Sequence, residues 1–102
     1  MPESLFVYGT LKDPKVQKEV FGRPTDGRPD VLEGYSKSEI EIHGESYPIL
    51  TPSDQGLVEG LVIEVTSEEL EKIDEYETAS YKRTRVDLKS GKQTWVYEKN
   101  ED

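Results

Sequence analysis

Residues 57–70 read LVEGLVIEVTSEEL, and this stretch decides the fold. Its first nine residues are rich in Val, Leu and Ile, which predicts the strongest β-strand of the chain. Gly60 stands inside that strand and indicates a β-bulge or a close approach of another backbone segment. The next four residues form a capping box, in which Thr66 caps the amide of Glu69 and the Glu69 side chain reaches back. A helix is therefore expected to begin directly after the strand.

The segments before this stretch also favour β-structure, interrupted by one short helix. Residues 5–8, LFVY, form an apolar run closed by a glycine and predict a buried strand. Asp13 and Pro14 predict the N-cap and the first residue of a short helix. Residues 22–29 are rich in Gly and Pro and predict a loop, and residues 31–42 predict one or two strands.

The chain after the second helix returns to β-structure. Residues 81–88 alternate along their length and predict a strand, and residues 93–98 predict another after a turn at Ser90 and Gly91. Many short strands with glycine turns favour a small, closed or strongly curved sheet, whereas a doubly wound parallel fold would need more helices. We therefore expect an α+β fold with one or two short helices, as a single domain over residues 1–102.

Composition and charge exclude several classes of function. Asp and Glu number 22 against 13 Lys and Arg, so the formal net charge is −9. Nucleic acids and anionic membranes are both bound by clustered positive charge, so neither partner is expected. No apolar run approaches the ~20 residues of a membrane span, and residues 1–4 lack the features of a signal peptide, so we expect a cytoplasmic protein. The absence of cysteine excludes disulfide and thiolate chemistry.

Glu77 stands apart from the other carboxylates and is the candidate catalytic residue. It follows Leu70 by seven residues and Ile73 by four, so a helix that continues this far turns Glu77 toward the core. A carboxylate is costly to ionise there, and its pKa would rise toward neutrality, as a general acid or base requires. The alternative is a helix that ends near Glu75 and leaves Glu77 in water.

The second candidate is the turn after the first strand, Tyr8-Gly9-Thr10-Leu11. A buried strand that ends in glycine allows a turn whose successive N–H groups converge on an anion such as a carboxylate. The alternative is a strand that glycine merely closes.

Three other side chains each allow more than one interpretation. Arg83 and Arg85 could anchor a substrate carboxylate, or they could pair with the excess of acidic residues. Tyr47 could line a pocket or belong only to a turn. His43, the single histidine, is expected at the surface, and no metal site is predicted.

Seven short motifs follow one another along nearly the whole chain. They are Phe6-Val7-Tyr8-Gly9-Thr10-Leu11-Lys12, Leu32-Glu33-Gly34-Tyr35, Tyr47-Pro48, Val58-Glu59-Gly60, Ile73-Asp74-Glu75-Tyr76-Glu77, Tyr81-Lys82-Arg83 and Trp95-Val96-Tyr97. In this order they resemble the gamma-glutamylcyclotransferase-like family, in the compact branch that includes gamma-glutamylamine cyclotransferase.

The resemblance implies a small mixed β-barrel flanked by helices, with a pocket at its mouth. The turn at residues 8–11 would hold the glutamyl part of a small γ-glutamyl substrate through main-chain N–H groups. Tyr47 and Tyr81 would line the pocket, and Glu77 would be the catalytic residue. At position 78 this chain has Thr78 where many relatives have glycine, which affects the loop after the acid.

The implied activity is the cyclisation of a γ-glutamyl amide to 5-oxoproline, with release of the amine or amino acid. No cofactor is expected, because the nucleophile and the electrophile belong to one molecule. Two other functions fit the same sequence. One is a non-catalytic module that binds a small carboxylate, and the other is an interaction domain whose acidic face meets a basic partner. The sequence names neither the leaving group nor the oligomeric state.

Overall fold

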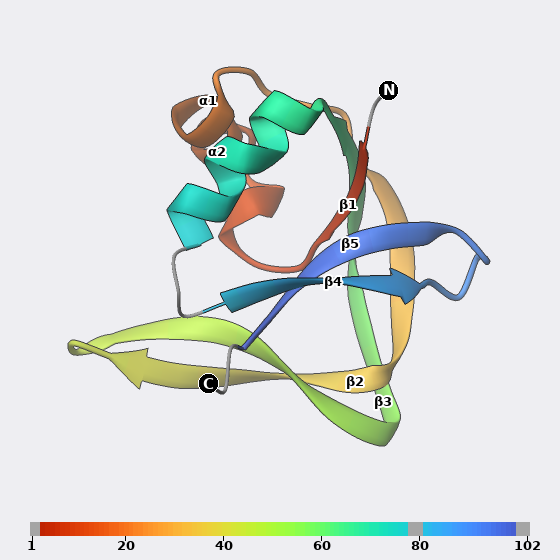
Figure 1. Cartoon of the computed structure of the whole chain (residues 1–102). Coiled ribbons are helices and arrows are strands. Elements are labelled where there is room, and N and C mark those ends of the chain that lie inside the picture. The colour runs from red at the N-terminus through yellow and green to blue at the C-terminus, as the bar shows by residue number, and fades with distance from the viewer. Residues whose placement is uncertain (1–2, 78–80, 100–102) are drawn as a thin grey trace.

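The computed structural model describes residues 3–77 and 81–99 and combines five strands with two helices (Figure 1). The strands are β1 (Glu3–Val7), β2 (Arg28–Ile42), β3 (Glu45–Val65), β4 (Tyr81–Asp87) and β5 (Gln93–Lys99). The helices are α1 (Pro14–Phe21) and α2 (Ser67–Glu77), and a short 3-10 turn, η1 (Thr10–Lys12), lies between β1 and α1. Neither of these helices is long and apolar enough to cross a bilayer. The predicted α+β class is confirmed.

The five strands form one mixed sheet in the order β2-β3-β1-β5-β4, in which only β1 and β5 run parallel. The sheet curls into a half-barrel, and α1 and α2 lie together on one side of it (Figure 1). In the described residues the edge strands β2 and β4 do not pair with each other. The loop after β4 joins these edges instead, because the amide of Lys89 donates to the carbonyl of Val31 at 2.8 Å.

Strand β3 continues through a proline and a glycine, residue types that usually interrupt a strand. Pro52 and Gly56 divide this segment in the sequence, yet β3 runs through both. Its pairing with β2 is interrupted there, between Glu33 and Tyr35 on the β2 side. Gly34 lies at the interruption with φ +88°, a conformation that favours glycine. The breakers therefore mark an irregular region within a long hairpin, not the end of a strand.

Gly60 marks a close approach of two strands, which is one of the two outcomes that the sequence predicted. A Cβ atom at this position would lie 2.4 Å from the carbonyl oxygen of Val7 and 2.7 Å from the ring of Phe6. Val7 is the last residue of β1 and leads directly into the turn that begins at Tyr8. Because Gly60 has no side chain, the end of β1 can pack closely against β3. This packing fixes where the turn at Tyr8 begins.

Two hydrophobic clusters pack on opposite faces of the sheet, because side chains alternate along each strand. The helix-side core consists of Leu5, Val7, Leu11, Phe21, Ile63, Val65, Leu70, Ile73 and Tyr97. The inner core consists of Phe6, Tyr8, Leu32, Leu50, Val58, Val62, Leu88 and Val96. Tyr35 of β2 and Val86 of β4 both pack against the inner core, so this core fills the inside of the curled sheet.

Both helices begin with the caps that the sequence predicted. At α1 the amide of Lys15 donates to Asp13 Oδ1 at 2.9 Å. At α2 the amide of Thr66 donates to Glu69 Oε1 at 2.8 Å, and the amide of Glu69 donates to Thr66 Oγ1 at 3.1 Å. The capping box therefore starts α2 within one residue of the end of β3.

Gln17 is a buried polar residue whose role the sequence does not indicate. Its side chain is almost fully buried, and its Nε2 donates to the carbonyl of Leu11 at 2.7 Å. Its Oε1 accepts from the amide of Thr25 at 2.7 Å and from the hydroxyl of the same residue at 2.9 Å. One side chain thus holds η1, α1 and the loop after α1 together.

Replacing this side chain is expected to weaken the fold. Gln17→Ala leaves the carbonyl of Leu11 and the amide of Thr25 without their partner, and each unsatisfied buried group costs about 1–3 kcal/mol. The free energy of unfolding, measured with urea, should fall by about 2–4 kcal/mol. Glu19→Ala, at an exposed position of the same helix, should change it by less than about 0.5 kcal/mol. Equal effects of the two changes would contradict this role of Gln17.

Candidate active site

Glu77 is the last residue of α2, so the alternative in which the helix ends near Glu75 is wrong. Leu70 and Ile73 of the same helix are buried, and Glu77 follows them as a partly buried residue. Burial raises the pKa of Glu77 from 4.5 to about 7, because the ionised carboxylate loses hydration. A carboxyl group with this pKa can both accept and donate a proton near neutral pH.

The turn at residues 8–11 follows β1 directly and includes the first two residues of η1. Within it, the amide of Lys12 donates to the carbonyl of Gly9 at 3.1 Å, and the amide of Asp13 donates to that of Thr10 at 3.0 Å. The first N–H groups of a helical turn have no carbonyl to bond within that turn. The amides of Thr10 and Leu11 are in this position, and such groups are suited to binding an anion.

The end of α2 lies beside this turn. The hydroxyl groups of Thr10 and Tyr76 share a hydrogen bond of 3.1 Å, and Tyr76 immediately precedes Glu77. The pKa of the Tyr8 hydroxyl is raised above its usual range, mainly by burial and secondly by the negative charge of Glu77. Glu77 therefore has an electrostatic effect on the first residue of the turn. The structure thus brings together the two features that the sequence singled out separately.

A chain of hydrogen bonds ties α2 to the strand beside the turn. The hydroxyl of Tyr8 donates to the carbonyl of Tyr97 at 2.5 Å, and the hydroxyl of Tyr97 donates to Asp74 Oδ1 at 2.6 Å. Asp74 also pairs with Arg83 at 3.2 Å. Asp74 lies three residues before Glu77 in α2, so these contacts fix the last turn of the helix that carries Glu77. Asp74 and Tyr97 carry no local sequence signal of this role, because their partners are distant in the chain.

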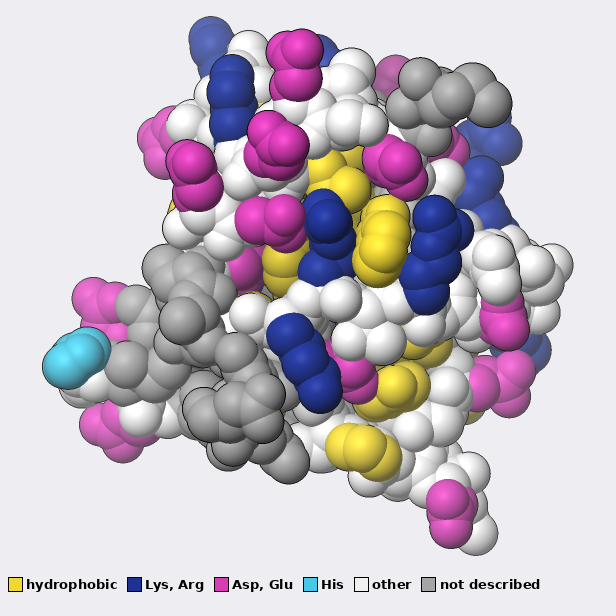
Figure 2. Space-filling view, viewed as in Figure 1, with side chains coloured by type: hydrophobic (Ala, Val, Ile, Leu, Met, Phe, Trp, Pro, Cys, Tyr) yellow, Lys and Arg dark blue, Asp and Glu magenta, His cyan; other side chains and the backbone are white. Residues whose placement is uncertain are grey.

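Arg83 and Arg85 pair with acidic residues of the chain, which is the second of the two interpretations that the sequence allowed. Arg83 contacts Asp74, and Arg85 Nη2 lies 3.9 Å from Glu3 Oε2. Both guanidinium groups lie over the ring of Trp95, at 4.5 and 4.7 Å from its centre. Figure 2 shows basic side chains around hydrophobic ones on the face that carries β4 and β5, with acidic side chains nearby. This arrangement stabilises the outer face of the sheet.

The remaining candidates are placed as follows. Tyr81 is the first residue of β4, and its partly buried side chain packs against the helix-side core. Its electrostatic effect also raises the pKa of the Tyr8 hydroxyl. Tyr47 belongs to β3, but its side chain and the whole of Thr78 lie outside the described residues. His43 is exposed at the turn between β2 and β3.

Two further residues, Lys37 and Glu98, act on Tyr8, and a third, Tyr35, contacts Glu98; the sequence did not indicate these roles. The ammonium of Lys37 donates to the main-chain carbonyl of Tyr8 at 3.4 Å. Burial and a hydrogen bond to Glu98 raise the pKa of the Tyr35 hydroxyl, and Glu98 also contributes to the shift at Tyr8. Lys37 and Tyr35 come from β2 and Glu98 comes from β5, so only the curl of the sheet brings them together.

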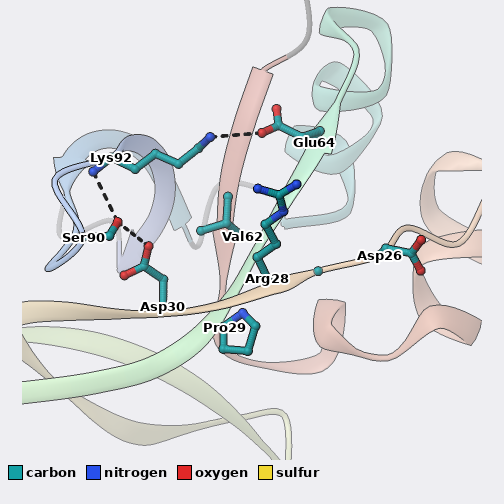
Figure 3. A pocket seen from close by; sticks show the side chains of 9 residues that line it. Asp26, Arg28, Pro29, Asp30, Val62, Glu64, Ser90 and Lys92 are labelled. Carbon is teal, nitrogen blue, oxygen red and sulfur yellow. Dashed lines mark hydrogen bonds and ion pairs between the residues drawn. The ribbon is translucent and has the colours of Figure 1, made fainter.

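An open cavity of about 480 Å³ lies elsewhere, between the start of β2, the end of β3 and the loop before β5 (Figure 3). One ion pair and one hydrogen bond join side chains of its lining. Lys92 Nζ lies 3.3 Å from Glu64, and the Ser90 hydroxyl donates to Asp30 at 2.6 Å. None of the candidate residues whose side chains the structure describes lines this cavity. Among the described residues, no group of three His, Asp or Glu side chains could hold a metal ion.

Comparison with known proteins agrees with the resemblance of the motifs. The family model for gamma-glutamyl cyclotransferase, AIG2-like proteins matches residues 5–102. AIG2-like protein C of Arabidopsis thaliana is 35% identical over 85 residues, which cover 82% of this chain and 48% of that protein. The chain therefore spans about half the length of this relative.

Two solved structures are similar over nearly the whole chain. A protein of Arabidopsis thaliana, solved in solution, superposes with a TM-score of 0.84 at 30% identity, over 100% of this chain and 66% of that one. A gamma-glutamyl cyclotransferase superposes with a TM-score of 0.78 at 14% identity, over 97% of this chain and 67% of that one. The second similarity shows a common fold alone.

Proposed function

Since the chain belongs to the gamma-glutamyl cyclotransferase, AIG2-like family, we propose that it converts a γ-glutamyl amide to 5-oxoproline and releases the amine or amino acid. The observation that supports this most is Glu77, a partly buried carboxyl group with a pKa of about 7. It stands at the end of α2, where Tyr76 bonds to Thr10 of the turn. An acid–base group thus lies next to main-chain donors suited to a carboxylate.

The proposed reaction closes a five-membered ring. The ionised Glu77 carboxylate accepts a proton from the substrate's α-ammonium group, and the freed amine attacks the γ-carbonyl carbon of the same molecule. The bond between that carbon and the leaving nitrogen then breaks, as Glu77 returns its proton to the leaving nitrogen. The ring nitrogen gives up a second proton, which makes the released amine an ammonium ion. A single carboxyl group with a pKa near the working pH serves both transfers, and this role typically contributes about 10²–10⁴-fold in rate.

The turn at residues 8–11 supplies orientation. Amides of Gly9, Thr10 and Leu11 would bind the α-carboxylate of the substrate or the oxyanion that develops on the γ-carbonyl. Holding the extended γ-glutamyl chain in a bent form brings the amine and the carbonyl together, and fixed geometry of this kind can remove up to about 7–11 kcal/mol of barrier. The substrate brings both reacting groups, so the proposed step needs only binding and proton transfer.

A product assay tests the proposal. The chain is incubated with γ-glutamyl amides whose leaving groups are free amino acids, the lysine side chain or polyamines, and 5-oxoproline is measured. Release of 5-oxoproline from at least one compound is expected. Compounds that bind but remain unchanged would show a non-catalytic carboxylate-binding module instead, and a complete lack of binding would contradict both functions.

The pH dependence of turnover follows from the pKa of Glu77. Only the ionised form accepts the first proton, and its pKa is raised to about 7, so kcat/KM should rise as the pH increases through about 7. Below pH 6 the rate should fall by about tenfold for each further pH unit, because the ionised fraction falls by that factor. A rate that stays flat from pH 4 to pH 8 would contradict the assignment.

A further inference from the structure

The open cavity in Figure 3 lies at the end of the curled sheet that is farther from the turn at residues 8–11. On the inner face, Ser4 precedes Phe6 of the inner core by two residues, and Tyr8 follows it by two. Ser4 pairs with Glu64 of β3 and donates to its carboxylate at 3.1 Å, and Glu64 lines the cavity. Because a strand rises about 3.3 Å per residue, Ser4 stands about 13 Å from Tyr8.

Arg28 brings to this cavity a cation that no acidic residue of the described chain neutralises. It is the first residue of β2 and is exposed, and its side chain extends beside that of its strand partner Val62 (Figure 3). No ion pair joins it to any of the described residues. A guanidinium group presents its N–H donors in a plane and binds a carboxylate through two parallel hydrogen bonds. Arg28 is therefore suited to a ligand carboxylate.

Asp30 supplies a fixed acceptor beside this cation. It lies two residues after Arg28, on the same face of β2. Its Oδ2 accepts from the hydroxyl of Ser90 at 2.6 Å, and its Oδ1 accepts from the amide of Val31 at 2.8 Å. The hydrogen bond from Ser90 is the main cause that lowers the pKa of Asp30, so the carboxylate is ionised at neutral pH. Each oxygen keeps a second lone pair, which can accept from a ligand.

The charges of the lining indicate which ligand fits. Lys92 and Glu64 form an ion pair of 3.3 Å, and the Asp26 side chain points away from the other labelled side chains (Figure 3). Arg28 and Asp30 remain, and their main chains are about 6–7 Å apart as same-face neighbours on a strand. A simple anion would satisfy Arg28 but would be repelled by Asp30, and a simple cation would meet the reverse. A molecule with a carboxylate and an ammonium on one carbon satisfies both.

We propose that this cavity binds a free α-amino acid, with its carboxylate on Arg28 and its ammonium on Asp30. Val62 and Pro29 provide apolar lining for its carbon atoms. Neither Glu77 nor the turn at residues 8–11 lines the cavity, so the inference goes beyond the proposed function and does not depend on it.

Three small probes that differ in one charged group test the proposal. L-Alanine has both groups, propionate lacks the ammonium, and ethylamine lacks the carboxylate. In the ¹⁵N-labelled protein, L-alanine should shift the amide signals of Arg28, Asp30 and Lys92. It should bind at least about tenfold more tightly than either other probe, the factor typical of one hydrogen bond to a charged group. Equal affinity for L-alanine and a probe with one charge would overturn the proposal. Shifts confined to the turn at residues 8–11, or no shifts at all, would also overturn it.

Substitutions test the two contacts separately. Arg28→Ala, at an exposed position, should weaken L-alanine binding by about 10- to 100-fold. Lys18→Ala removes an exposed cation of α1 and should change it by less than about twofold. Equal losses in these two variants would reduce the effect to net charge and overturn the proposal.

Asp30→Asn removes the negative charge with little change of shape, so it should weaken binding of L-alanine but not of propionate. Equal weakening of both probes would contradict the contact between Asp30 and the ammonium. Glu77→Gln should bind L-alanine as the unchanged protein does, because Glu77 does not line the cavity. Loss of 5-oxoproline release and loss of this site are therefore told apart.

Discussion

Glu77→Gln is expected to abolish the release of 5-oxoproline while the fold remains intact. The amide has nearly the shape of the carboxyl group but cannot take a proton from the substrate's ammonium or return one to the leaving nitrogen. General acid–base catalysis typically contributes about 10²–10⁴-fold, so kcat should fall by at least about a hundredfold. The measurement is 5-oxoproline formation from a compound that the unchanged protein converts.

Glu75→Gln is the matched control, because Glu75 belongs to the same turn of α2 but is exposed. It should retain turnover within about twofold. Near-normal turnover by Glu77→Gln, or an equal loss in both variants, would contradict the role of Glu77.

The same variant also reports on the burial of Glu77. A carboxyl group with a pKa of about 7 when folded and 4.5 in its ordinary state binds its proton more tightly in the folded protein. Its contribution to stability is therefore present below about pH 4.5 and is lost as the pH rises to about 7. Glutamine has no such dependence, so Glu77→Gln should gain stability over the unchanged protein between these values, by at most about 3 kcal/mol.

Gly60→Ala is expected to lower the free energy of unfolding markedly. The added methyl group would lie 2.4 Å from the carbonyl oxygen of Val7 and 2.7 Å from the ring of Phe6, closer than atoms can pack. Either β1 moves away from β3 or the buried ring of Phe6 leaves its position. Overpacking of this kind costs about 1–3 kcal/mol, and the rigid main-chain neighbour places this case at about 3 kcal/mol.

Urea unfolding measures this effect, with Glu59→Ala as the control at the exposed neighbouring position. The control should unfold within about 0.5 kcal/mol of the unchanged protein. Because Val7 leads into the turn at Tyr8, Gly60→Ala should also lower turnover in molecules that remain folded. Unfolding of Gly60→Ala at the same urea concentration as the unchanged protein would contradict the close packing of β1 on β3.

Local patterns predicted the parts of the fold that local interactions create. The capping box at Thr66 and the N-cap at Asp13 are formed by residues two or three positions apart, and both are present. The spacing of Glu77 from Ile73 placed it on the buried face of the helix only if the helix continued that far, and α2 does extend to Glu77. The glycine at position 60 predicted either a β-bulge or a close approach, and the structure has the close approach, although the sequence could not identify Phe6 and Val7 as the neighbours.

The sequence could not predict features that depend on distant segments. Gln17 resembles an ordinary helix residue, and only the packing of η1 and the loop at Thr25 against α1 explains its burial. Asp74 resembles a solvated acid, yet Tyr97 and Arg83 reach it from two strands. Pro52 and Gly56 lie within β3, and the irregular pairing with β2 at this place has no distinct pattern of its own in the sequence.

The proposed catalysis requires that the Glu77 carboxyl group, beside the turn at residues 8–11, is buried enough to exchange a proton at neutral pH. A ¹³C NMR titration of the glutamate side chains, with Glu77→Gln to assign the signal, measures this directly. We expect the Glu77 carboxyl to titrate with a midpoint near 7, as its pKa indicates. A midpoint near 4.5 would show a solvated carboxylate and would contradict the proposed role of Glu77 as an acid–base group.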